Sequence, residues 1–197
     1  MPKASLRETI LDAGLQVMFK RGYAASGVRD IVAAASSPQG SFTNHFRSKE
    51  AFAVEVLQRY FDNMRGFIQQ TLGDASKSPR ERLRAYLDLI TAKLESREWT
   101  CGCLIGNFSV EASTQSEELR LQLSHIFAEW RLPFAACIRE GQQIGEIDDQ
   151  FSAEDIADFL IAGWQGTMLR MKVDRSPKPI QQFKAIAFAT FLGSKRT

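Results

Sequence analysis

Apolar residues recur at helical spacing along nearly the whole chain. In the first such segment, residues 5–21, the side chains of Ile10, Gly14, Val17 and Met18 fall on one face of a helix. No stretch alternates apolar and polar residues with the β-branched side chains typical of strands, and no Asn-Gly or Asp-Gly hairpin signal occurs. The pattern therefore predicts an all-α protein in which apolar helix faces pack together.

Capping residues predict where these helices begin and end. Ser5 precedes Glu8 at capping-box spacing, Gly22 follows two cations, and Ser37-Pro38 and Ser48 suit the starts of further helices. Residues 73–79 form the clearest linker. The expected helices cover residues 5–21, 27–35, 38–46, 49–72, 79–98, 103–113, 116–143, 152–172 and 179–192.

Two short expected helices, 27–35 and 38–46, are separated by a tight turn, as in a helix-turn-helix. In the second helix Phe42 and Phe46 are four residues apart and should face the core. The remaining side chains should face outward: Gln39, Ser41, Thr43, Asn44 and His45. Glutamine and asparagine bond adenine through two hydrogen bonds, and serine and threonine bond phosphates or bases. Gly40 lacks a side chain where the backbone must approach DNA or a neighbouring helix.

The distribution of charge is compatible with nucleic-acid contact. Residues 1–60 contain eight basic and five acidic residues, whereas the rest of the chain contains 17 basic and 18 acidic residues. A basic segment beside a nearly neutral remainder fits a DNA-binding head. An excess of three charges is also common on an ordinary solvated surface.

The helix-turn-helix segment resembles the TetR family of transcriptional regulators. The resemblance covers residues 5–60 and is carried by Ile10–Gly14, Gly22-Tyr23, Val28–Ile31, Gly40–Phe42 and Asn44–Ala51. It implies a DNA-binding domain over residues 4–64 and a ligand-binding and dimerisation domain over residues 65–197. Lys49, at the start of the fourth expected helix, should contact phosphate. The family usually has Tyr where this chain has Thr43 and Lys where it has Gln39.

The same resemblance implies a homodimer that reads a palindromic operator in double-stranded DNA and is released by a small-molecule inducer. The last two long helices, 152–172 and 179–192, would form a four-helix bundle between the subunits. Phe159 and small residues such as Gly163 and Gly166 suit close helix packing there. The alternative is that these apolar stripes only complete the subunit's own core.

The cysteine pair Cys101 and Cys103 suggests a second mode of regulation. A thiol at the start of a helix is activated by the helix dipole, and Gly102–Leu104 resembles the segment of the sensor cysteine in electrophile-responsive TetR regulators. The alternative is that Cys103 only packs, as buried cysteines commonly do. Cys-x-Cys is not a usual zinc spacing, so a site formed with His125 is disfavoured, and we expect neither a metal nor a cofactor.

Residues after the linker include candidates for a ligand pocket, because aromatic side chains commonly line such pockets. The candidates are Trp99, Cys103, Asn107, Phe108, Glu111, Trp130 and Trp164. The alternative is that the aromatic residues are core and that the polar ones face solvent.

Two other functions remain possible at this point. A redox enzyme using the two neighbouring cysteines would lack the βαβ context of thioredoxin-like motifs, and an architectural DNA binder should be more basic than this chain. No apolar run reaches the roughly 20 residues of a membrane span, and Met1–Ser5 begins no secretory signal, so we expect a cytoplasmic protein with no membrane partner.

Overall fold

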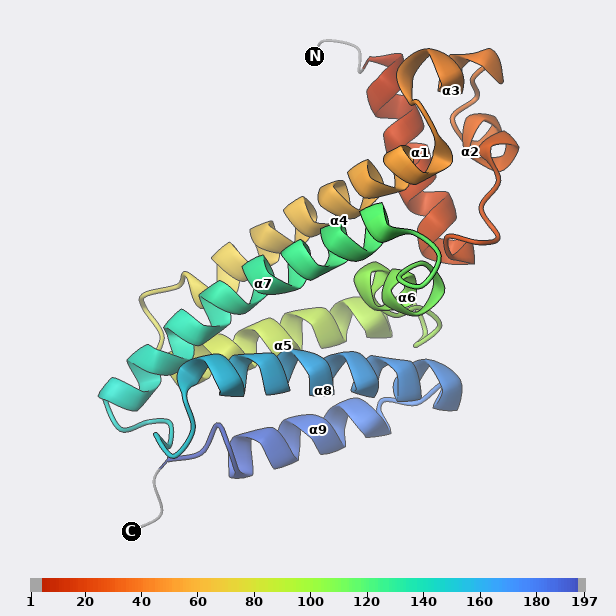
Figure 1. Cartoon of the computed structure of the whole chain (residues 1–197). Helices are drawn as coiled ribbons and strands as arrows, with labels where there is room; N and C mark the ends of the chain where they lie inside the picture. The colour runs from red at the N-terminus through yellow and green to blue at the C-terminus, as the bar shows by residue number, and fades with distance from the viewer. Residues whose placement is uncertain (1–4, 195–197) are drawn as a thin grey trace. The chain divides into compact units, whose positions relative to one another are not determined.

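The computed structural model describes residues 5–194, so the expected domain start at residue 4 lies outside it. Between residues 5 and 194 there are nine helices and no strand (Figure 1). The expectation of an all-α fold is thus confirmed. The helices are α1 (Leu6–Arg21), α2 (Val28–Ala34), α3 (Gly40–His45), α4 (Lys49–Leu72), α5 (Pro79–Glu95), α6 (Leu104–Glu111), α7 (Glu117–Gln143), α8 (Ala153–Asp174) and α9 (Lys178–Ala189).

Most helix ends follow the capping residues in the sequence. Ser5 accepts a hydrogen bond from the backbone N–H of Glu8, and Ser48 accepts one from Ala51. Gly22 ends α1 with φ +83°, a left-handed value that residues other than glycine rarely adopt. These bonds satisfy N–H groups that the first turn of each helix leaves without a partner.

The start of α3 differs from the prediction. The helix begins at Gly40 rather than at Pro38, and the Ser37 hydroxyl donates to the Ala35 carbonyl at 3.1 Å instead of capping α3. The physical reason is a turn in which the Ser41 N–H donates to the Pro38 carbonyl, so that residues 38 and 39 lead into the helix from outside.

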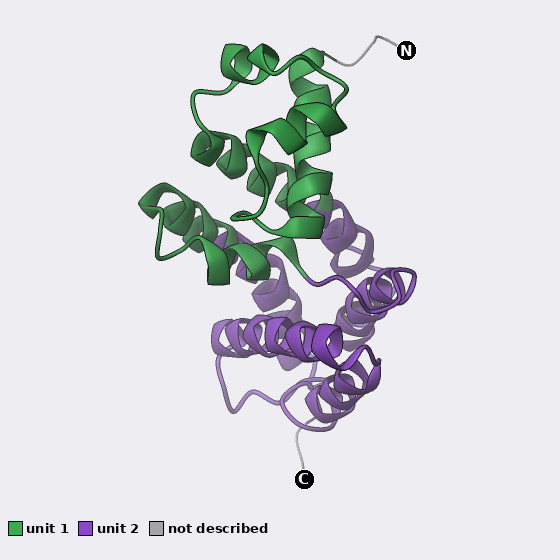
Figure 2. Cartoon of the chain, turned by 90° about the vertical axis from the view of Figure 1, so that its right-hand side faces the viewer, with its two compact units in different colours: residues 1–63, 103–126 green, residues 64–102, 127–197 purple. Residues whose placement is uncertain are grey.

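The chain divides into two compact units, shown in different colours in Figure 2. Unit 1 contains residues 1–63 and 103–126, and unit 2 contains residues 64–102 and 127–197. Residues 103–126, which we expected in the second domain, therefore cluster with the helix-turn-helix.

An aromatic cluster anchors α3 inside unit 1. The rings of Phe42 and Phe46 lie 5.0 and 4.6 Å from that of Phe52 in α4, and all three are buried. Gly14 of α1 lies against Phe52, and a Cβ at Gly14 would overlap that ring. The close approach of α1 and α4 thus depends on the missing side chain of Gly14.

The helices of unit 2 pack around a core that contains large aromatic side chains. Trp130, Trp164 and Tyr86 are buried almost completely, and Tyr86 packs edge-on against Phe134 at 4.9 Å. Helices α8 and α9 run side by side (Figure 1). In the part of the chain that the structure describes, every helix is too short or too polar to cross a membrane.

The packing at Gly14 gives a test of the fold. The Gly14→Ala variant should lose about 1–3 kcal/mol of unfolding free energy, because its methyl group would displace the Phe52 ring in a close-packed core. Gly66→Ala in α4 is the matched control, since a Cβ there meets open space and should stabilise the helix by about 0.5–1 kcal/mol. Urea unfolding of both variants measures the difference, and equal stability would contradict the packing described.

Candidate DNA-binding site

The outer face of α3 is polar and exposed. Phe42 and Phe46 point into the core, whereas Gln39, Thr43, Asn44 and His45 are exposed and Ser41 is half-buried. The Thr43 hydroxyl donates to the Gly40 carbonyl at 3.0 Å. The predicted outward side chains are therefore all exposed or half-buried.

Gly40 has open space around it. A Cβ at this position would meet no heavy atom within 4 Å, so no neighbouring helix of the chain requires a glycine here. Of the two reasons considered for this glycine, approach to a neighbouring helix is therefore unsupported. Close approach to DNA stays a prediction for Gly40.

Lys49 is the predicted phosphate ligand, and neighbouring groups orient its side chain. Its ammonium nitrogen lies 4.5 Å from the centre of the Tyr23 ring and 3.5 Å from the Ala24 carbonyl oxygen, to which it donates. Partial burial lowers the pKa of the Lys49 ammonium group, and the Glu111 carboxylate opposes that shift. The cation is thus directed by the turn between α1 and α2, a contact that the sequence pattern did not reveal.

Helix α6 and the start of α7 hold the DNA-binding segment inside unit 1. The Glu111 carboxylate accepts a hydrogen bond from the Ala24 N–H at 3.1 Å, and the Phe108 ring lies edge-on to Tyr23 at 5.6 Å. Arg47 pairs with Glu118 at 2.6 Å. Glu111 and Phe108, two of the candidate ligand residues, therefore contact the turn that orients Lys49.

The remaining ligand candidates are distributed over both units. Cys103 is buried in unit 1, where its sulfur accepts a hydrogen bond from the Tyr60 hydroxyl at 3.7 Å, and Asn107 is half-buried in the same unit. In unit 2, Trp99 is half-buried in left-handed backbone (φ +59°), and Trp130 and Trp164 belong to the core. The structure thus does not gather these candidates into one cluster within either unit.

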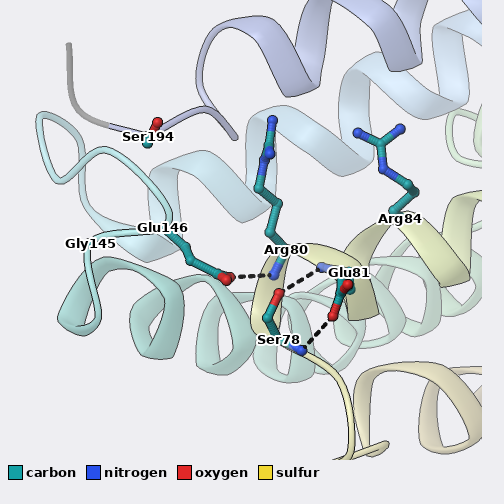
Figure 3. Close-up of a pocket in the computed structure, with 7 residues that line it drawn as sticks. All are labelled: Ser78, Arg80, Glu81, Arg84, Gly145, Glu146 and Ser194. Carbon is teal, nitrogen blue, oxygen red and sulfur yellow. Dashed lines mark hydrogen bonds between the residues drawn. The ribbon is translucent and has the colours of Figure 1, made fainter.

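A hollow of about 610 Å³ on unit 2 is lined by polar residues (Figure 3). Ser78 and Glu81 cap the start of α5, and the Glu146 carboxylate accepts from the Arg80 N–H. The Arg80 side chain donates to the Phe188 carbonyl in the last turn of α9 and to the Leu192 carbonyl just after that helix. Arg84 lies over the Phe188 ring at 3.9 Å. These groups serve the protein's own packing, so we assign no ligand to the hollow. Among residues 5–194, no three His, Cys, Asp or Glu side chains are grouped as metal ligands.

The chain matches two family descriptions and several known regulators. Residues 10–56 match "Bacterial regulatory proteins, tetR family", and residues 79–187 match "Tetracyclin repressor-like, C-terminal domain". The chain is 46% identical to the HTH-type transcriptional repressor DhaR of Mycobacterium sp. (strain GP1), over 98% of this chain and 96% of DhaR. It is 30% identical to the transcriptional regulator AcuR of Cereibacter sphaeroides, over 92% of this chain and 84% of AcuR.

A solved structure supports the same assignment. The crystal structure of the reduced form of Escherichia coli NemR superposes with a TM-score of 0.86 at 26% identity, over 98% of this chain and 100% of that one. The match to the C-terminal family covers more than half of the chain, and the similarity to DhaR spans almost all of it. The chain therefore belongs to the TetR family.

Proposed function

We propose that this protein is a transcriptional repressor that binds a palindromic operator as a homodimer and leaves it when a small ligand binds. The observation that carries the proposal is the two-sided character of α3. Its aromatic side is anchored in the core of unit 1, and its polar side is exposed. A short helix held in this way presents side chains to the major groove.

The polar residues in and beside α3 have three kinds of role in the proposal. Asn44 and Gln39 read adenine edges, because an amide group makes two hydrogen bonds to that base. Ser41, Thr43 and His45 contact bases or phosphates at the margins, and Gly40 lets the backbone come close. Lys49, directed by Tyr23 and the Ala24 carbonyl, binds a phosphate and sets the position of the helix.

Substitutions at Asn44 and Lys49 should separate base reading from phosphate binding. Asn44→Ala should weaken operator binding by about 1–3 kcal/mol and leave binding to unrelated DNA unchanged, because it removes only base contacts. Lys49→Ala should weaken binding to every sequence and reduce the slope of log K against log salt by about one. Fluorescence anisotropy at several salt concentrations measures both.

Asn63→Ala is the matched control, since Asn63 is an exposed asparagine of α4 outside the helix-turn-helix. It should bind the operator like the parent protein. An Asn44→Ala variant that binds as the parent does would remove Asn44 from the interface.

An exposed apolar stripe on α8 supports the homodimer. Phe159, Leu169 and Val173 have 62%, 50% and 76% of their surface exposed, and Gly166 lies between them on the same face of the helix. Ile186 of α9 is likewise 61% exposed. Apolar side chains gathered on one surface mark an interaction site, and a second copy of the chain would cover them.

Phe159→Glu should therefore give a folded monomer. The glutamate is solvated in the isolated chain but would be buried without a partner in the dimer. Analytical ultracentrifugation measures the mass, and circular dichroism checks the fold. Val110→Glu is the control, because Val110 is 72% exposed on α6, outside the proposed interface. A Phe159→Glu protein that stays dimeric would place the interface elsewhere.

We assign DNA binding to residues 4–64 and ligand binding and dimerisation to residues 65–197. Residues 103–126 pack with the DNA-binding segment through Glu111 and Phe108, which suits a segment that reports ligand binding to the head. Because the target is chromosomal DNA, we place the protein in the cytoplasm.

Burial of Cys103 supports a noncovalent ligand over thiol chemistry. Only 6% of Cys103 is exposed, whereas Cys101 is half-buried and lies 3.9 Å from the Arg97 guanidinium. Burial raises the pKa of the Cys137 thiol to about 11, which disfavours its reactive thiolate form.

In the native protein N-ethylmaleimide should therefore label Cys101 at least about tenfold faster than Cys103 or Cys137, because thiolate and access set the rate. Mass spectrometry of a labelling time course reads the three sites, and urea-unfolded protein serves as the control in which all three react. Fast labelling of Cys103 together with release of DNA would instead support electrophile sensing through that thiol.

A further inference from the structure

Helices α7 and α8 contain three buried hydrogen-bond donors that have no acceptor. They are Nε1 of Trp130, Nε of Arg131 and Nε2 of Gln165. In residues 5–194 one other buried side-chain atom shares this property, Nε of Arg82, and that guanidinium is otherwise bonded to Glu140 and to the Leu72 carbonyl. All four atoms are nitrogens, so what the buried sites lack is an acceptor.

Ion pairs show that α7 and α8 lie side by side in unit 2, with the donors of Arg131 and Gln165 at the seam between them. Arg139 pairs with Glu154, and Arg131 with Asp158 at 3.2 Å, so α7 and α8 are antiparallel. Gln165 comes seven residues after Asp158 and therefore lies on the same face of α8, toward α7. Continued along the two helices, these pairs place Gln165 within about two helical turns of Trp130.

The surroundings of these donors restrict the chemistry of an occupant. The charges of Arg131 and Asp158 compensate each other, as do those of Arg139 and Glu154, so the seam offers no net charge. The neighbouring side chains are apolar: Phe127 stacks on Trp130 at 6.1 Å, and Ile161 and Trp164 are buried. An anion or a cation would have to lose its hydration there without a counter-charge.

We propose that this seam binds a small, neutral, mostly apolar molecule through one hydrogen-bond acceptor, such as a ketone oxygen, bonded to Trp130 Nε1 and the Gln165 amide. Native proteins rarely leave buried polar groups without a partner, and such groups commonly mark a missing ligand or water. The inference rests on the proposed function, in which a small ligand releases the repressor, and it names the chemical class of that ligand.

Two matched probes test the role of the acceptor. Acetophenone carries a carbonyl oxygen, and α-methylstyrene has the same shape with a methylene group in its place. The chain has three tryptophans, so protein labelled with ¹⁵N in the indole rings gives three indole N–H resonances. Trp99→Phe, Trp130→Phe and Trp164→Phe assign them.

Acetophenone should move the Trp130 indole proton downfield in a saturable manner, and α-methylstyrene should not. The acceptor should also make acetophenone bind roughly threefold to tenfold more tightly than α-methylstyrene, the difference expected of one hydrogen bond. Gln165→Leu should reduce this preference, and Gln143→Leu, an exposed glutamine of α7, should retain it.

The melting temperature separates a binding role of Gln165 from a structural one. Without ligand, Gln165→Leu should melt at the same or a higher temperature, because an unsatisfied buried amide is replaced by an apolar group of similar size. A marked drop would show that the amide has a partner within the protein, and would overturn the proposal.

Two further results would overturn it. One is an unmoved Trp130 resonance with acetophenone, cyclohexanone and 2-heptanone, each up to about 10 mM, a concentration above the Kd expected for a specific site of this kind. The other is a long-lived water contact of the indole proton that no ketone displaces. Operator binding of the unliganded protein is measured separately. If the ligand tests fail but the unliganded protein binds its operator, only the ligand inference is wrong. If the unliganded protein binds no operator, the proposed function is wrong.

Discussion

The contact of three phenylalanine rings determines what the DNA-binding unit presents to its surroundings. Phe42 lies in a six-residue helix and Phe46 directly follows it, and both pack on Phe52 of α4. A helix this short has little stability of its own and depends on tertiary packing. Because the aromatic side is fixed in the core, the opposite side, with Gln39, Thr43 and Asn44, is fixed toward solvent. Gly14 completes the arrangement by letting α1 approach the Phe52 ring.

The sequence was sufficient for the features that depend on local periodicity. Apolar spacing and caps predicted nine helices in the correct order, and the alternation of phenylalanine and polar residues in 39–46 predicted the exposed face of α3. The start of α3 was placed two residues early, because Ser37-Pro38 satisfies the local rule for a helix start equally well. The competing turn, in which Ser41 N–H bonds the Pro38 carbonyl, depends on how the loop packs and has no distinct local signal.

The sequence patterns could not predict contacts between residues that are far apart in the chain. Glu111 was a candidate pocket residue, yet its carboxylate bonds the Ala24 N–H, 87 positions away. Residues 103–126 were expected with the ligand-binding region, but they cluster with the head through this bond and through Phe108. Cys103 illustrates the same limit, since a position before a helix suggests reactivity, whereas its burial beneath the Tyr60 hydroxyl appears only in three dimensions. The unpaired donors of Trp130 and Gln165 are likewise visible only once the neighbours of each atom are known.

The central claim is that two copies of the exposed face of α3 read DNA symmetrically. Selection of binding sites from a random pool of duplex DNA, followed by sequencing, tests this most directly. The account predicts one enriched motif with two inverted half-sites whose centres are separated by about one helical turn or a multiple of it, because a two-fold dimer presents two identical helices. Enrichment of an asymmetric site, or no enrichment over the starting pool, would contradict it.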